Sequence, residues 1–197
     1  MTREEIEFFD RISETWDEEE VLSTPSKIKE ILDVIHVEEA MTILDLGTGT
    51  GVLLPYLAEI VGVDGRIMAV DISEGMLSKA RKKYGQISQV EFLLLDFEQE
   101  RISGEFDLIL LYCVYPHLHF PKETLNRLLR ENLSNRGRIV IAFPTDENFI
   151  NNIHKEKKAE SDMLPSAHDL AMRLREWGMK ARVVSSSTDR YIVEITR

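Results

Sequence analysis

The sequence has a single cysteine, Cys113, and lacks any continuous apolar run long enough to cross a bilayer. One cysteine cannot form an intrachain disulfide, and a transmembrane helix needs about 18 or more apolar residues in a row. The N-terminus also lacks the basic and apolar regions of a signal peptide. We therefore expect a cytoplasmic protein that has no membrane partner.

Positive charge is also scarce, because 24 lysines and arginines stand against 35 aspartates and glutamates, a formal net charge of −11. A surface of this sign repels polyanions, so nucleic acid is an unfavourable partner. The basic cluster at 79–83 is expected to be solvent-exposed on a helix. The 197 residues, 43% of them hydrophobic, predict one domain over 1–197, with a helical N-terminal cap over 1–40 and an α/β core over 41–197.

Apolar segments of strand length alternate with segments of helical periodicity from residue 42 onward. Alternation of this kind is typical of a parallel sheet flanked by helices. The predicted strands are 42–46, 66–70, 90–95, 106–112 and 137–143, and the predicted helices are 52–61, 73–84, 121–133 and 166–177. Two further strands, 181–187 and 190–196, have too short a link for a crossover helix and must pair as a hairpin. The sequence therefore predicts an α/β fold: a doubly wound, mostly parallel seven-stranded sheet with one antiparallel C-terminal strand.

The most informative stretch is 43–51, in which a short apolar strand leads into Gly47, Gly49 and Gly51. Glycines in a strand-to-helix turn let a ligand approach the backbone and the N–H groups of the following helix. Val52 stands where a dinucleotide fingerprint needs glycine, and no lysine closes the turn as in a Walker loop. The turn favours another adenosine-type ligand, with a purely structural glycine turn as the alternative.

Two carboxylates support the ligand-binding interpretation. Asp71 ends the second predicted strand and Asp96 ends the third, so both are expected beside the glycine turn. An ionised carboxylate accepts hydrogen bonds from vicinal ribose hydroxyls, and hydrogen bonds to charged groups contribute about 1.5–3 kcal/mol. Either acid alone could be a solvated loop residue. Together with the glycines they predict a ribosyl ligand.

The pattern Asp45-x-Gly47-x-Gly49-x-Gly51, the strand-end acids and the terminal hairpin resemble the class I S-adenosylmethionine-dependent methyltransferases. The resemblance covers roughly residues 40 to 197 and implies a methyltransferase enzyme with a Rossmann-like fold and S-adenosylmethionine as cofactor. It also implies that the ribose lies at Asp71 and that the adenine lies at Asp96 beside Phe97. The cofactor-binding residues expected on this basis are Asp45, Gly47, Thr48, Gly49, Gly51, Asp71, Ile72, Met76, Asp96, Phe97 and Cys113.

The N-terminal segment carries aromatic residues beside acids, at Phe9-Asp10 and Trp16-Asp17. This pattern looks like the N-terminal helices with which small-molecule methyltransferases cover the cofactor. Ordinary packing of the two aromatic side chains on the sheet explains the pattern equally well.

Three histidines are candidate catalytic residues. His117 and His119 follow the predicted strand 106–112, and His154 follows the strand 137–143, so all three are expected at the ligand-binding edge of the sheet. Methyl transfer needs a base only when the acceptor arrives protonated, and histidine suits that role. A structural role in packing remains the alternative. The spacing of these residues and Cys113 is not a zinc pattern, so we expect no metal site.

The predicted rim lacks the Asn/Asp-Pro-Pro-Tyr/Phe motif that the resembled enzymes use to methylate planar amino groups. A small-molecule acceptor is therefore favoured over nucleobase or protein-amide acceptors. Two alternatives stay open: a non-catalytic protein that binds S-adenosylmethionine, and a methyltransferase that acts on a protein or RNA partner. The sequence leaves open the acceptor atom, the oligomeric state and whether residues 144–165 form a lid.

Overall fold

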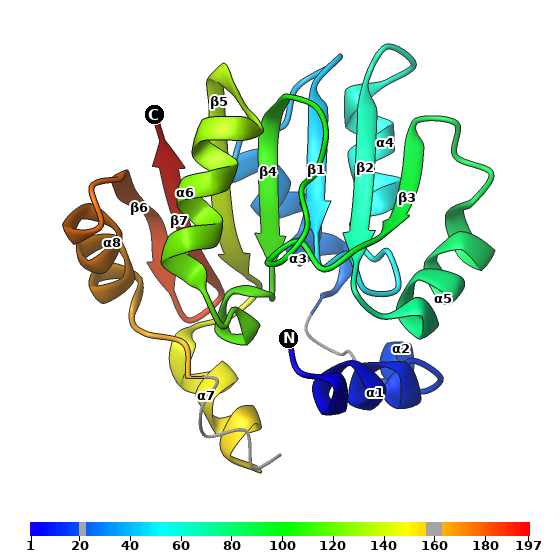
Figure 1. Ribbon diagram of the computed structural model, residues 1–197, viewed down its shortest axis with the longest axis horizontal. Coiled ribbons are helices and arrows are strands. Elements are labelled where there is room, and N and C mark those ends of the chain that lie inside the picture. Colours follow the sequence, from blue (N-terminus) through cyan, green and yellow to red (C-terminus); the bar gives the residue numbers. More distant parts are fainter. Residues whose placement is uncertain (20–22, 157–162) are drawn as a thin grey trace.

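The computed structural model describes residues 1–19, 23–156 and 163–197, and these contain a seven-stranded sheet (Figure 1). The strands are β1 (Thr42–Leu46), β2 (Arg66–Asp71), β3 (Val90–Leu94), β4 (Phe106–Tyr112), β5 (Leu133–Phe143), β6 (Lys180–Ser187) and β7 (Arg190–Thr196). They are arranged in the order β3-β2-β1-β4-β5-β7-β6. β7 is antiparallel to both of its neighbours, whereas the pairs from β3 to β5 are parallel. The predicted fold class is confirmed.

Helices cover both faces of the sheet. Along β1, Ile43 and Leu44 point to opposite faces, as successive residues of a strand do, and belong to two separate apolar clusters. α3 (Pro25–Val34) and α4 (Leu54–Val61) contribute to the cluster with Ile43, whereas α6 (Pro121–Glu131) and α8 (Ala167–Glu176) contribute to the cluster with Leu44. α5 (Glu74–Tyr84) contacts β2 and β3. None of the helices in the described residues is long and apolar enough to cross a membrane.

The predicted strand 137–143 begins earlier than expected. β5 starts at Leu133, which pairs with Phe106 ahead of an irregularity in the β4–β5 register. The polar residues Ser134, Asn135 and Arg136 give this part of the sequence the character of a turn. These residues form the irregularity itself, because β4 pairs with Leu133 and then again from Arg138 onward, and Ser134 Oγ donates a 2.9 Å hydrogen bond to Asp107 Oδ1 on β4.

Several short helices lie at the carboxyl ends of the parallel strands. Figure 1 shows α1 (Arg3–Ile12) and α2 (Trp16–Glu19) at this edge, on the side of β2, and α7 (Glu147–Glu156) on the side of β6 and β7. A single turn of 3-10 helix, η1 (Tyr115–His117), follows β4 at the same edge. Segments distant in sequence thus flank the carboxyl ends of the parallel strands (Figure 1).

Polar contacts attach α1 and the segment after it to α5. Asp10 Oδ1 accepts hydrogen bonds from Ser73 Oγ at 2.5 Å and from the backbone N–H of Gly75 at 3.0 Å. Lys79 forms a 2.6 Å ion pair with Glu14, and Lys83 pairs with Asp17. The expectation that the basic cluster at 79–83 is simply solvent-exposed was therefore wrong for these two lysines, because the acidic N-terminal segment supplies partners.

Candidate functional site

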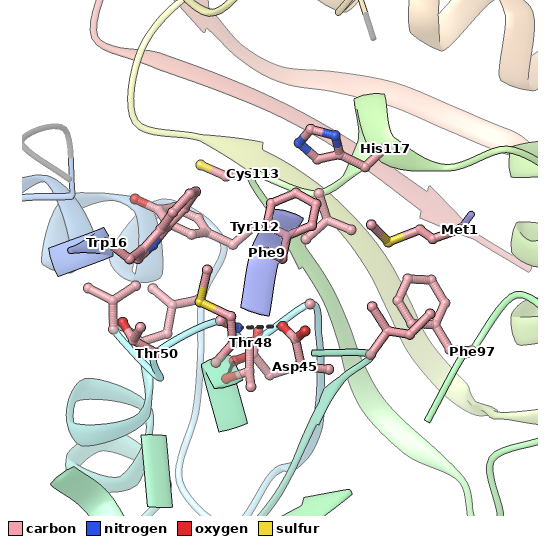
Figure 2. A pocket seen from close by; sticks show the side chains of 18 of the residues that line it. Met1, Phe9, Trp16, Asp45, Thr48, Thr50, Phe97, Tyr112, Cys113 and His117 are labelled. Atoms are coloured by element: carbon pink, nitrogen blue, oxygen red, sulfur yellow. Dashed lines mark hydrogen bonds between the residues drawn. The ribbon is translucent and has the colours of Figure 1, made fainter. Parts of the chain in front are cut away.

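A cavity opens at the carboxyl ends of β1, β2 and β4, with an empty volume of about 980 Å³ including its mouth (Figure 2). The glycine turn and the strand-end acids form one side, and side chains from the N-terminal segment and from the end of β4 form the other. The lining residues that the sequence analysis selected are Asp45, Gly47, Thr48, Gly49, Asp71, Ile72, Met76, Asp96, Phe97, Cys113 and His117. Residues far apart in the sequence thus share one concave surface.

The three glycines of the turn differ in what surrounds them. Gly49 has φ +56°, and a Cβ built on it would meet no protein atom within 4 Å, so its backbone borders open space in the cavity. Gly51 has φ +84°, and a Cβ there would lie 2.8 Å from Leu54 and 2.9 Å from Tyr84. Gly51 does not line the cavity, and its requirement for glycine comes from conformation and packing. Gly49 is the position where a ligand can approach the backbone.

Asp71 connects the glycine turn to α5. Its Oδ2 accepts from the backbone N–H of Gly49 at 2.8 Å, and its Oδ1 accepts from the backbone N–H of Ser73 at 2.9 Å. Burial raises the pKa of this carboxyl, and the two backbone hydrogen bonds oppose that effect. Each carboxylate oxygen has a second acceptor position, so Asp71 can still bind hydroxyl groups of a ligand in the cavity.

Asp45, at the end of β1, is 2% exposed. Burial raises its pKa from the ordinary 3.8 to about 6; a 2.7 Å hydrogen bond from Thr48 Oγ1 opposes this rise, and the nearby Asp71 carboxylate adds to it. A positively charged ligand group at this point favours the ionised carboxylate. The site is therefore suited to an ammonium group.

Two acids lie at the end of β3. Asp96 Oδ1 accepts from the backbone N–H of Glu98 at 2.9 Å, and its Oδ2 lies 3.5 Å from the α-ammonium of Met1. Glu98 accepts from the backbone N–H groups of His119 at 3.1 Å and Phe120 at 2.8 Å. Glu98 was not among the predicted site residues, although it follows Asp96-Phe97 directly and this proximity alone could have indicated it. Glu98 fixes the loop between β4 and α6 at the cavity.

The opposite side of the cavity is formed by Phe9, Trp16, Tyr112 and His117, which we call the aromatic wall (Figure 2). The Phe9 ring contacts the Trp16 ring edge to face at 6.3 Å between centroids, and it contacts the His117 ring at 5.5 Å. Tyr112 forms a 2.9 Å hydrogen bond with Ser23. Rings from α1, α2, β4 and η1 thus face the glycine turn.

The three candidate histidines occupy different places. His117 lines the cavity, and the His154 ring, from α7, lies 5.5 Å from it between centroids without lining the cavity itself. His119 does not line the cavity, because its Nε2 lies 3.0 Å from Glu5 Oε1 on α1. Cys113 lines the cavity with φ +59°, an uncommon conformation for a residue other than glycine. Of the three histidines, His117 is therefore the best placed to contact a ligand.

The fold and the cavity together define the class: an S-adenosylmethionine-dependent methyltransferase domain. The sequence model of the family described as "Methyltransferase domain" matches residues 37–193. The chain belongs to this family. The prediction of the class I fold and of S-adenosylmethionine as its cofactor is confirmed.

Curated relatives match part of the chain. A malonyl-[acyl-carrier protein] O-methyltransferase of Acetivibrio thermocellus is 33% identical over 117 residues, which are 58% of this chain and 40% of that protein. An enzyme of the same name from Anoxybacillus flavithermus is 30% identical over 113 residues, 57% of this chain and 42% of that protein. The match therefore covers less than half the length of either relative.

Solved structures match nearly the whole chain. An S-adenosylmethionine-dependent methyltransferase from Aquifex aeolicus superposes with a TM-score of 0.71 at 26% identity, over 88% of this chain and 94% of that one. A methyltransferase solved with the Trm112 activator of Haloferax volcanii superposes with a TM-score of 0.75 over 100% of this chain and 97% of that one. Its 18% identity supports the shared fold alone.

Proposed function

We propose that this protein transfers a methyl group from S-adenosylmethionine to a small-molecule acceptor. The observation that carries the proposal is the shared cavity, in which the glycine turn and the strand-end acids face an aromatic wall that contains His117. We also propose that residues 1–197 act as one methyltransferase domain, with residues 1–40 as its helical cap. We propose a cytoplasmic location, and the single cysteine of the chain is compatible with a reducing compartment.

The glycine-turn side of the cavity suits the cofactor. The open space beside Gly49 admits a ligand against the backbone, and Asp71 has acceptor positions for the ribose hydroxyls. Asp45 suits the ammonium of the methionyl group, and Asp96 with Phe97 suits the adenine. When bound, S-adenosylmethionine supplies an electrophilic methyl group on a sulfonium.

The aromatic wall would hold the acceptor and shield the reaction from water. Alignment of two reactants can contribute up to about 7–11 kcal/mol, so orientation is the main contribution expected from the protein. We assign to His117 the role of receiving a proton from the acceptor. Phe9 contacts one side of the His117 ring and His154 lies on another, so the orientation of this imidazole is restricted.

A second candidate acceptor follows from the names of the relatives, which act on a malonyl group carried by an acyl-carrier protein. That acceptor has a free carboxylate and is attached to a protein. The test is to incubate the protein with methyl-labelled S-adenosylmethionine and separate small-molecule products from labelled protein.

Calorimetry tests the cofactor half of the proposal. S-adenosylmethionine and S-adenosylhomocysteine should both bind, and Asp71→Asn should weaken binding at least tenfold, because the amide keeps only one of the two acceptor oxygens and turns an NH2 group toward a backbone N–H. Asp64→Asn, in an exposed turn remote from the cavity, is the matched control. Absence of binding to the wild-type protein would refute the proposal. Binding without methylated product across a broad acceptor screen would favour a non-catalytic protein instead.

A further inference from the structure

Given the proposed methyl transfer, on which this inference rests, we propose that the acceptor is a basic amine on an apolar skeleton, methylated on its nitrogen. The charge of the cavity and the composition of the aromatic wall both favour such an acceptor. A carboxylate, the acceptor group of a malonyl methyltransferase, would fit this cavity less well.

The charged groups around the cavity are mainly negative. Four carboxylates line it, those of Asp45, Asp71, Asp96 and Glu98. Among the described residues, no lysine or arginine side chain lines the cavity, and the positive group there is the α-ammonium of Met1. Interactions between charges strengthen as the dielectric constant falls inside a protein. A carboxylate acceptor would therefore add another negative charge where no side-chain cation compensates it.

The course of the reaction favours nitrogen for the same reason. The bound ammonium first gives one proton to His117. The freed nitrogen lone pair then forms a bond to the methyl carbon while the carbon–sulfur bond breaks and its electron pair stays on sulfur. The positive charge moves from sulfur to nitrogen, so the methylated product is again an ammonium, held at the aromatic wall of a cavity whose other side is acidic. An oxygen acceptor instead reacts as an anion, a carboxylate or a hydroxyl that has lost its proton, so the positive charge of the sulfonium is cancelled. The acidic lining therefore stabilises the neutral products of oxygen methylation less than it stabilises the methylated ammonium.

The aromatic wall adds a binding site for a cation. Aromatic faces attract an ammonium group by about 0.5–2 kcal/mol, depending on desolvation. Phe9 and Trp16, which stand against each other, belong to α1 and α2 and lie outside the family match at 37–193. We therefore assign the preference for an amine to the N-terminal segment of this chain rather than to the shared domain.

Three probes with one skeleton test the inference: 2-phenylethylamine, 2-phenylethanol and phenylacetate. Each is titrated by calorimetry into the protein saturated with S-adenosylhomocysteine. The amine should bind about tenfold or more tightly than phenylacetate, which corresponds to about 1.4 kcal/mol, with the alcohol between them. Methyl-labelled S-adenosylmethionine and the amine should yield the N-methyl product.

Variants of Phe9 test the aromatic wall, and a lysine introduced at an exposed phenylalanine outside the cavity provides the control. Phe9→Leu should weaken amine binding severalfold without improving phenylacetate binding, because it removes a ring and changes no charge. Phe9→Lys should reverse the preference by placing a cation on the aromatic wall. Phe149→Lys makes the same change on α7, where Phe149 is 47% exposed and does not line the cavity, so the preference should stay.

Phenylacetate binding as tightly as the amine, no binding of any probe, or an unchanged preference in Phe9→Lys would each overturn the inference. These outcomes are distinct from failure of the proposed function. If the wild-type protein does not bind S-adenosylhomocysteine, the methyltransferase proposal itself is refuted. Normal cofactor binding with a preference for carboxylate refutes the amine assignment alone.

Discussion

Replacing Asp45 by asparagine should stabilise the cofactor-free protein while weakening its affinity for S-adenosylmethionine. The Asp45 carboxylate is buried at the end of β1, where ionisation is costly, and its pKa is raised to about 6. Asparagine is nearly the same size and can keep the hydrogen bond from Thr48, but it carries no charge. A residue retained at the expense of stability is typical of a binding site.

The size of the effect follows from the pKa difference between the folded and the unfolded chain. Between pH 3.8 and about 6 the folded protein binds more protons at Asp45 than the unfolded chain does, so stability falls as the pH rises through this window. Above the window the ionised carboxylate costs about 3 kcal/mol, and at pH 5 it costs about 1.5 kcal/mol. The gain from Asp45→Asn should therefore be about twice as large at pH 8 as at pH 5.

Urea unfolding at the two pH values measures this gain. Asp64→Asn is the control, because it removes the same charge from an exposed turn and should change the free energy of unfolding by less than about 0.5 kcal/mol at either pH. A destabilising effect of Asp45→Asn at pH 8, or a gain that is the same at pH 5 and pH 8, would show that ionisation of Asp45 does not destabilise the folded protein.

Three further predictions concern the acceptor side, the N-terminal helix and the core. His117→Ala should lower turnover while S-adenosylmethionine affinity by calorimetry stays within about twofold, and unchanged turnover would remove His117 from the mechanism. Asp10→Ala removes the acceptor of two hydrogen bonds to α5 and should speed proteolysis within residues 1–19; equal cleavage rates in mutant and wild type would contradict this role. Leu57→Ala, in the core between α4 and the sheet, should cost about 2–5 kcal/mol in urea unfolding, and a cost below about 1 kcal/mol would show that the site is not tightly packed.

The sheet was predictable from the sequence because its signals are local. The strands 42–46, 106–112 and 190–196 match the observed bounds, since each is rich in apolar residues and adjoins a turn or a bend. The prediction that the glycine turn and the strand-end acids meet depended only on parallel pairing, which places the carboxyl ends of neighbouring strands at one edge.

Contacts between distant segments could not be read from the sequence. His119 was expected at the ligand-binding edge, but its ring faces Glu5 on α1, a partner that no local pattern indicates. Lys79 and Lys83 likewise find their partners in the N-terminal segment. The helix α7 was not predicted, although Ile150 and Ile153 have helical spacing. Whether residues 144–165 form a lid stays an open question, and residues 157–162 of this segment lie outside the described residues.

A crystal structure of the protein with bound S-adenosylhomocysteine would show whether the cavity holds the cofactor as proposed. We expect the ribose hydroxyls within hydrogen-bond distance of the Asp71 carboxylate, the adenine in contact with Phe97, and the sulfur facing the aromatic wall. A ligand bound elsewhere, or one whose sulfur points away from Phe9 and His117, would contradict this expectation.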